Sequence, residues 1–135
     1  MTSGTPSDEE IDPQLLDLWA RVFGMARSGD TKSLVAYIEA GIPANLTNDR
    51  GDTLVMLAAY HGHAEAVAAL IERGADPGRV NDRGQSPLAG AVFKNEPDVV
   101  KALIDGGADP KAGTPSAIEA ATMFGNAELL ALLER

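Results

Sequence analysis

The sequence contains no cysteine among its 135 residues, so it forms no disulfide and offers no thiolate to a metal ion or to catalysis. Aromatic residues make up only 4% of the chain. No apolar run approaches the roughly 18 residues that a membrane-spanning helix needs. The core must therefore consist of Ala, Leu, Val and Ile, which favours closely stacked short helices over a thick β-sandwich.

Positive charge is also scarce. The chain has 11 Lys and Arg against 20 Asp and Glu, which gives a formal net charge of −9. Binding to a phosphate backbone needs Lys and Arg presented together, so we do not expect nucleic acid as a partner. Residues 1–6 contain neither a basic start nor an apolar run. We therefore expect no secretory signal, no membrane association and a cytoplasmic location.

The sequence does contain a repeated unit of 33 residues. Residues 48–51 read Asn-Asp-Arg-Gly, and residues 81–84 are identical. Residues 74–77 read Gly-Ala-Asp-Pro, and residues 107–110 are again identical at the same offset. A period of this length is typical of stacked repeat proteins.

Each unit predicts a turn followed by two short helices. Asn48 and Gly51 are suited to the first and fourth positions of a type I turn. Thr53 is a suitable N-cap for a first helix over 54–61. His63 is the expected cap of a second helix, whose apolar stripe consists of Val67, Leu70 and Ile71. Neither helix is long enough to be stable alone in water, so the stripe must be buried against a neighbouring copy.

Residues 62–65 (Gly-His-Ala-Glu), 74–76 (Gly-Ala-Asp) and 86–88 (Ser-Pro-Leu) resemble the ankyrin repeat. The resemblance implies an all-α solenoid of helix-turn-helix units with projecting β-turns and capped ends. Met56 and Ala89 depart from the family pattern, because each replaces the histidine that links adjacent turns in that family. We expect repeats at approximately 12–47, 48–80, 81–112 and 113–135, preceded by a disordered acidic tail over 1–11.

The two ends of the predicted stack differ from its interior. Asp12 and Pro13 start a first helix that is longer than its counterparts and carries Trp19 and Phe23, which we expect to cover one end. The fourth copy lacks three residues around 111–115. It has Glu134 where the second copy has Ile71, as a terminal repeat requires.

Little in the sequence indicates catalysis. The chain has two histidines and neither a nucleophile elbow nor a glycine-rich phosphate loop. The one group that could bind a metal ion is His61, His63 and Glu65, and the repeat already assigns His63 to helix capping. We expect no enzyme activity, no cofactor and no bound metal. A metal-dependent enzyme that uses these three residues is the less favoured alternative.

The resemblance implies a concave groove lined by the turns and by the ends of the first helices. The partner-binding residues that it indicates are Asp49, Arg50, Asp52, Tyr60, His61, Asp82, Arg83, Gln85, Phe93 and Lys94. Two simpler interpretations stay open. In the first, the Asp–Arg pairs have no binding role and merely bridge adjacent turns. In the second, the two aromatic side chains are partly buried beneath the turns.

The most favoured function is a non-enzymatic module that binds a protein partner, as an adaptor or an inhibitor, and is itself a monomer. The net charge of −9 favours a partner with a mixed or basic surface. The alternative is a self-associating structural protein, because Leu129 and Leu132 are expected to lie exposed on the final helix.

Overall fold

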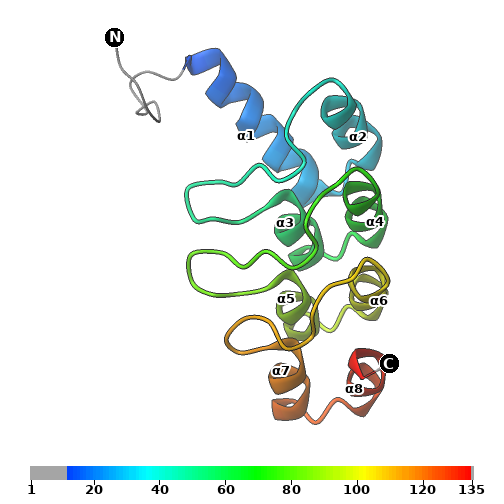
Figure 1. Cartoon of the computed structure of the whole chain (residues 1–135). Helices are drawn as coiled ribbons and strands as arrows, with labels where there is room; N and C mark the ends of the chain where they lie inside the picture. The colour runs from blue at the N-terminus through cyan, green and yellow to red at the C-terminus, as the bar shows by residue number, and fades with distance from the viewer. Residues whose placement is uncertain (1–11, 135) are drawn as a thin grey trace.

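The computed structural model describes residues 12–134, and within them the chain is helical, with one isolated β-bridge between Thr47 and Thr53. Residues 1–11, where the acidic tail is predicted, lie outside this part. The helices, shown in Figure 1, are α1 (Pro13–Ser28), α2 (Thr31–Glu39), α3 (Leu54–Tyr60), α4 (Ala64–Glu72), α5 (Pro87–Phe93), α6 (Pro97–Asp105), α7 (Ala117–Met123) and α8 (Ala127–Leu133).

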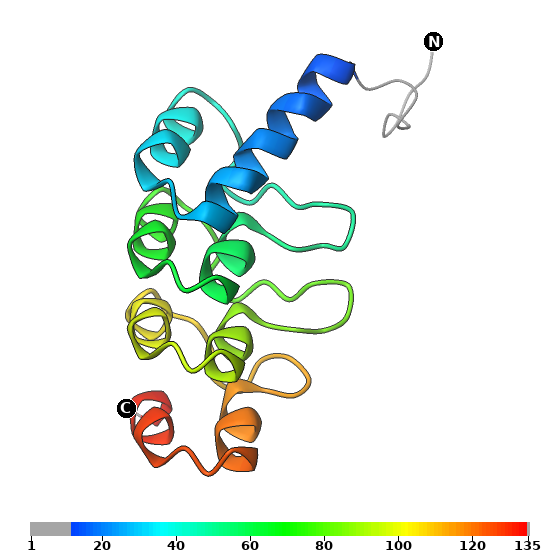
Figure 2. The ribbon, with the colours of Figure 1, turned by 180° about the vertical axis from the view of Figure 1, so that it is seen from behind.

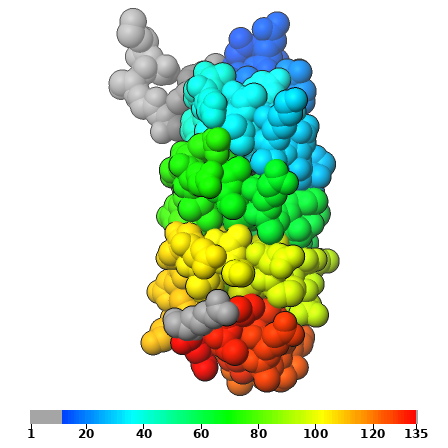
Figure 3. Space-filling view, turned by 90° about the vertical axis from the view of Figure 1, so that its right-hand side faces the viewer, coloured from blue at the N-terminus to red at the C-terminus, as the bar shows by residue number. Residues whose placement is uncertain are grey.

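The helices form two parallel columns. The inner column contains α1, α3, α5 and α7, and the outer column contains α2, α4, α6 and α8; each helix packs on its neighbours within its column. The connections into α3, α5 and α7 project away from the outer column (Figures 1 and 2). Figure 3 shows the outer face, on which the repeats follow one another in chain order. The predicted all-α solenoid of helix-turn-helix units is confirmed.

Side-chain caps start the inner helices. The hydroxyl of Thr53 accepts a hydrogen bond from the Met56 N–H at 3.0 Å, and that of Ser86 accepts one from the Ala89 N–H at 3.1 Å. Ser116 does the same for α7 and forms a reciprocal capping box with Glu119. Thr53, Ser86 and Ser116 are buried, so each cap satisfies donors that water cannot reach. The predicted cap at Thr53 is confirmed.

The two columns are joined by residues with left-handed backbone. Gly62 has φ +82°, and Asn95 has φ +53° at the same position of the next repeat, where asparagine tolerates this conformation. His63 is the N-cap residue of α4, as predicted, but its side chain makes no cap hydrogen bond. Its Nε2 atom instead lies 2.7 Å from the carbonyl oxygen of Arg27, which ties α4 to the end of α1.

The core runs between the columns through all the repeats. Val67 and Leu70 of α4 are buried, as are their counterparts Val100 and Leu103 of α6. The expectation that Leu129 lies exposed is wrong, since only 1% of it is accessible. Position 129 corresponds to Ala66 and Val99, and all three are buried. Leu132 is partly buried against the same core.

The ends of the stack are closed in different ways. α1 has 16 residues, and its second half buries Val22, Phe23 and Ala26 while Trp19 is partly buried. Its first half extends beyond the stack (Figure 2), and Leu15 and Leu16 there are exposed. At the other end, Glu134 is exposed at the position that corresponds to the partly buried Ile71 of α4.

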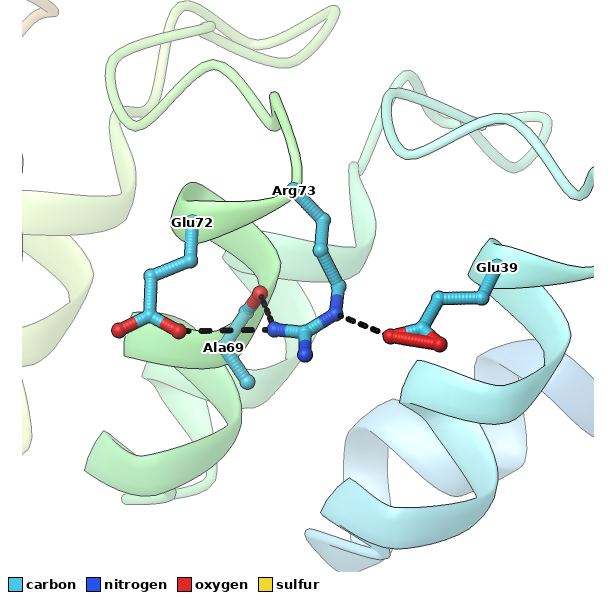
Figure 4. A network of polar contacts seen from close by, with 4 residues as sticks. All are labelled: Glu39, Ala69, Glu72 and Arg73. Atoms are coloured by element: carbon cyan, nitrogen blue, oxygen red, sulfur yellow. Dashed lines mark hydrogen bonds and ion pairs between the residues drawn. The ribbon is translucent and has the colours of Figure 1, made fainter.

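Arg73, which caps the end of α4, links two repeats on the outer side. Its Nε atom lies 3.3 Å from Oε1 of Glu39 in α2, and its Nη1 atom lies 3.5 Å from Oε2 of Glu72 (Figure 4). Nη1 also donates a hydrogen bond to the carbonyl oxygen of Ala69 at 2.9 Å. This guanidinium is therefore neutralised by carboxylates of the protein itself.

Candidate functional site

The two complete turns share one internal frame, built on an asparagine side chain. Oδ1 of Asn48 accepts hydrogen bonds from the N–H groups of Arg50 and Asp52, at 2.9 and 3.0 Å. Asn81 holds Arg83 and Gln85 in the same way, at 3.0 Å each. The N–H of Gly51 also donates to the Asn48 carbonyl, which closes the predicted turn.

Neighbouring turns are also bonded to each other. The N–H of Asp82 donates to the Arg50 carbonyl at 3.0 Å, and the N–H of Thr114 donates to the Gly84 carbonyl at 2.9 Å. Nδ2 of Asn81 donates to Oδ1 of Asp52 at 2.9 Å. These hydrogen bonds join all three projecting turns into one row.

Gly51 is required where two turns meet. Its φ is +77°, and a Cβ atom built there would lie 2.5 Å from Oδ1 of Asp82. Within residues 12–134, no ion pair between an Asp and an Arg side chain joins two turns, so the simpler interpretation of bridging ion pairs is not supported. The ion pairs of that part all involve Arg73.

A hollow of about 530 Å³ lies between this row of turns and the inner helices. Its floor includes Met56 and Leu57 of α3 and Ala89 and Gly90 of α5. The predicted site residues that line it are Arg50, Asp52, Tyr60, His61, Arg83, Gln85 and Phe93. Asp49, Asp82 and Lys94 are exposed outside its lining. We call this hollow the groove.

Tyr60 and Phe93 end α3 and α5 and present their rings at the groove. Their exposed fractions are 46% and 49%, so about half of each residue is accessible to a partner. Nζ of Lys94 lies 5.0 Å from the centroid of the Tyr60 ring, within cation–π range. The His61 ring meets the Tyr60 ring edge to face, with centroids 5.5 Å apart.

Sequence reasoning missed Arg27 in the groove lining and two exposed residues at the end of α7. Arg27, which also lines the groove, lies 33 positions before Tyr60 and so occupies the same place in the first repeat. Met123 is the matching residue at the end of α7. The C-cap residue that follows it, Phe124, packs edge to face on Phe93, with centroids 5.3 Å apart. The 33-residue offset, shortened by three in the last repeat, would have found all three.

His61 has its pKa lowered, first by partial burial and then by the nearby charges of His63, Arg27 and Lys94. No group of three His, Asp or Glu side chains suited to holding a metal ion occurs in residues 12–134. The His63 ring instead contacts the Arg27 carbonyl, so the less favoured alternative of a metal site at His61, His63 and Glu65 finds no assembled set of ligands in this part of the chain.

A family model for ankyrin repeats, in three copies, matches residues 22–114 of the chain. The chain belongs to the ankyrin-repeat family. Ankyrin repeats are in general protein–protein interaction modules, and the family is typically non-enzymatic.

Two individual proteins resemble this ankyrin-repeat chain. An ankyrin repeat protein of Pseudomonas aeruginosa, PA3287, is 42% identical over 55 residues, which cover 41% of this chain and 32% of that protein. The crystal structure of the human ASB11 ankyrin repeat domain matches with a TM-score of 0.74 and 26% identity, over 84% of this chain and 52% of that one. The chain thus spans only part of either relative.

This ankyrin-repeat chain joins its turns without the histidine usual in the family. Met56 and Ala89, which replace it, are buried in the groove floor. The link between turns comes instead from the Asp82 to Arg50 main-chain bond and the Asn81 to Asp52 side-chain bond. None of the helices within residues 12–134 is long and apolar enough to cross a membrane.

Proposed function

We propose that this chain is a non-enzymatic binding module that holds part of a partner protein in the groove. The observation that carries the proposal is the groove itself, where seven of the residues predicted for partner binding line one hollow of about 530 Å³. Half-exposed aromatic rings surrounded by polar side chains are typical anchors of protein interfaces.

The fixed frame of the turns supports the same proposal. Arg50, Asp52, Arg83 and Gln85 are all held through their own backbone N–H groups by Asn48 or Asn81. Binding therefore does not have to order these loops first, which lowers its entropic cost. The module acts as an adaptor or as an inhibitor that masks its partner.

The alternative of self-association was based on two exposed leucines, and one of them is not exposed. Leu129 is buried in the core, and Leu132 is partly buried. We propose that the chain is a monomer in the cytoplasm, with the four repeats at the limits given above. Sedimentation equilibrium at increasing concentration measures the oligomeric state, and a mass of twice 14.1 kDa would contradict the monomer.

Affinity capture from an extract of the source cells tests the proposal. Three immobilised baits are compared by quantitative mass spectrometry: the unmodified chain, the double variant Tyr60→Ala/Phe93→Ala, and the control Lys101→Ala. Lys101 is exposed on the outer helix α6. We expect partners that the unmodified chain and the control retain and the double variant loses.

The opposite pattern would contradict the proposal. Partners that survive Tyr60→Ala/Phe93→Ala but are lost with Lys101→Ala would place binding on the outer helices. Each bait is first checked by circular dichroism and thermal unfolding, because a loss of fold would also abolish capture.

A further inference from the structure

The charge of the groove is opposite in sign to that of the chain. The net charge is −9, yet three arginines, Arg27, Arg50 and Arg83, line the groove, together with one carboxylate, Asp52. The ammonium group of Lys94 lies near the same surface, above the Tyr60 ring.

The single carboxylate in the groove already has partners. Oδ1 of Asp52 accepts a hydrogen bond from Nδ2 of Asn81 at 2.9 Å, and Oδ2 accepts one from Nδ2 of Asn48 at 3.4 Å. Asp52 thus belongs to the frame of the turns, and it makes no ion pair with an arginine within residues 12–134.

The guanidinium groups of Arg27, Arg50 and Arg83 have no ion pair or hydrogen bond to any residue in the described part of the chain. Arg73 differs from these three arginines, because its guanidinium contacts two carboxylates and a carbonyl and so links two repeats (Figure 4). Three exposed arginines around one groove therefore keep their bidentate binding capacity for another molecule.

Except for Asp52, the carboxylates of the repeats lie outside the groove lining. Glu65, Asp98 and Glu128 occupy the first turns of the outer helices, where they complement the helix dipole. The lowered pKa of His61 agrees with a positive surrounding, because Arg27, Lys94 and His63 all contribute to it after burial. Apart from Asp52, the lining of the groove contains no carboxylate that could offset its three arginines.

We propose that the groove binds an acidic peptide segment of a partner protein, in extended conformation, through carboxylates at the arginines and an apolar side chain at Tyr60 and Phe93. This inference rests on the proposed function. Packed helices lie about 10 Å apart and an extended chain rises about 3.3 Å per residue, so about six residues span Arg27, Tyr60 and Phe93.

A peptide fits these charges better than a nucleic acid does. The acidic outer helices and the turn residues Asp49 and Asp82 would repel a continuous polyanion, whereas a short segment places its few carboxylates only at the arginines. The net charge of −9 describes the whole surface, and the groove that would bind the partner differs from it in sign.

Selection from a random dodecapeptide library by mRNA display tests the inference. The targets are the unmodified chain, the charge reversal Arg50→Glu/Arg83→Glu, and the matched reversal Lys32→Glu/Lys101→Glu on the outer helices, which changes the net charge equally. We expect peptides enriched in Asp and Glu from the unmodified chain and the control. Their affinity should fall about tenfold or more in the groove reversal, and change about twofold or less in the control.

Other outcomes separate this inference from the proposed function. Peptides without acidic enrichment that depend on Tyr60 and Phe93 would overturn the acidic segment and leave the groove as the site. Peptides insensitive to every groove substitution, or no selected peptide at all, would overturn both. If a single-stranded dodecanucleotide binds more tightly than the selected peptides and loses affinity in the groove reversal, the peptide assignment is wrong.

If the reversal variant fails to fold, Arg50→Gln/Arg83→Gln replaces it. That variant removes the charge without placing carboxylates side by side, and the same tenfold loss is expected.

Discussion

Gly90 and Gly106 both have helical backbone, but the space around their α-carbons differs. A Cβ atom at Gly90 would meet the Tyr60 ring at 3.7 Å and Sδ of Met56 at 3.9 Å, both ordinary contacts. At Gly106 it would lie 2.7 Å from Cδ1 and 3.1 Å from Cγ2 of Ile71. Gly90 therefore leaves the groove floor open, whereas Gly106 lets α6 approach α4.

Gly90→Ala should raise the free energy of unfolding by up to about 1 kcal/mol, since alanine is the better helix former and its methyl group fits. Gly106→Ala should lower it by about 1 to 3 kcal/mol, because Ile71 must move. Urea denaturation measures both. Equal changes of the same sign would contradict this account of the two sites.

His61 makes the stability depend on pH in a known direction. Its folded pKa lies below the unfolded value, so the unfolded state binds more protons as the pH falls through the unfolded pKa. The contribution of His61 is therefore fully present above that pKa and is lost as the solution is acidified.

In His61→Gln, the free energy of unfolding should fall less between pH 7.5 and pH 5 than in the unmodified chain. Denaturant titrations across this range measure the difference. It should be small, because His61 is exposed. A steeper fall in the variant would show that the imidazolium stabilises the fold.

Sequence patterns predicted individual residues well where backbone geometry alone decides. The cap at Thr53 follows from a local preference of serine and threonine for the start of a helix. The direction in which a side-chain ring points does not follow from such preferences, so the contact of His63 with the Arg27 carbonyl could not be predicted from the sequence. Arg27 has no turn or cap signal of its own, and an arginine there differs in type from the Tyr60 and Phe93 that hold the same place in the next two repeats.

The buried stripes of the outer helices make the repeats depend on one another. α4 packs against both α2 and α6, and α6 packs against both α4 and α8. A buried residue at the centre of α4 or α6 therefore supports more than one interface between repeats.

Leu70→Ala and Leu103→Ala should each lower the free energy of unfolding by about 2 to 5 kcal/mol. Ala68 is exposed on α4, so Ala68→Gly should cost only about 1 kcal/mol, through helix propensity. Equilibrium unfolding in urea measures all three. Equal losses would show that the assignment of faces on α4 is wrong.

Periodicity predicted which segments are helices, and it placed Val67, Leu70 and their counterparts correctly. It failed at α8, where Leu129 was assigned to the exposed side. In the second repeat this position holds Ala66, which carries little hydrophobic signal, although it is fully buried. Val99 in the third repeat holds the same place and would have shown that the buried stripe is wider.

Because every repeat contacts only its neighbours, stability should vary along the stack. α7 and α8 have a neighbouring repeat on one side within the described residues, whereas α3 to α6 have neighbours on both. Terminal repeats of such arrays lose part of their stabilising interface.

Native-state hydrogen exchange should therefore show less protection for the amides of α7 and α8 than for those of α4 and α6. Mass spectrometry of peptic fragments, or NMR, measures this. Equal protection throughout would indicate that residues 12–134 unfold in a single step without fraying at the C-terminal repeat.

The solenoid could be predicted because its long-range order repeats a local pattern, so each copy independently indicates the same unit. The sign of the groove could not be predicted from composition. A net charge is a sum over the whole surface, whereas the fold brings Arg27, at the end of the first helix, to the same groove as the turn residues Arg50 and Arg83.

In the row of turns, the atoms that bond one turn to the next differ from the side chains that can be replaced without loss of those bonds. The bonds between turns use the main chain of Arg50 and Asp82 and the side chains of Asn81 and Asp52. The guanidinium groups of Arg50 and Arg83 take no part in them. These two positions can therefore be rewritten, by evolution or by library design, without altering the scaffold that presents them, and the same stack can acquire a new target by exchanging side chains at its tips.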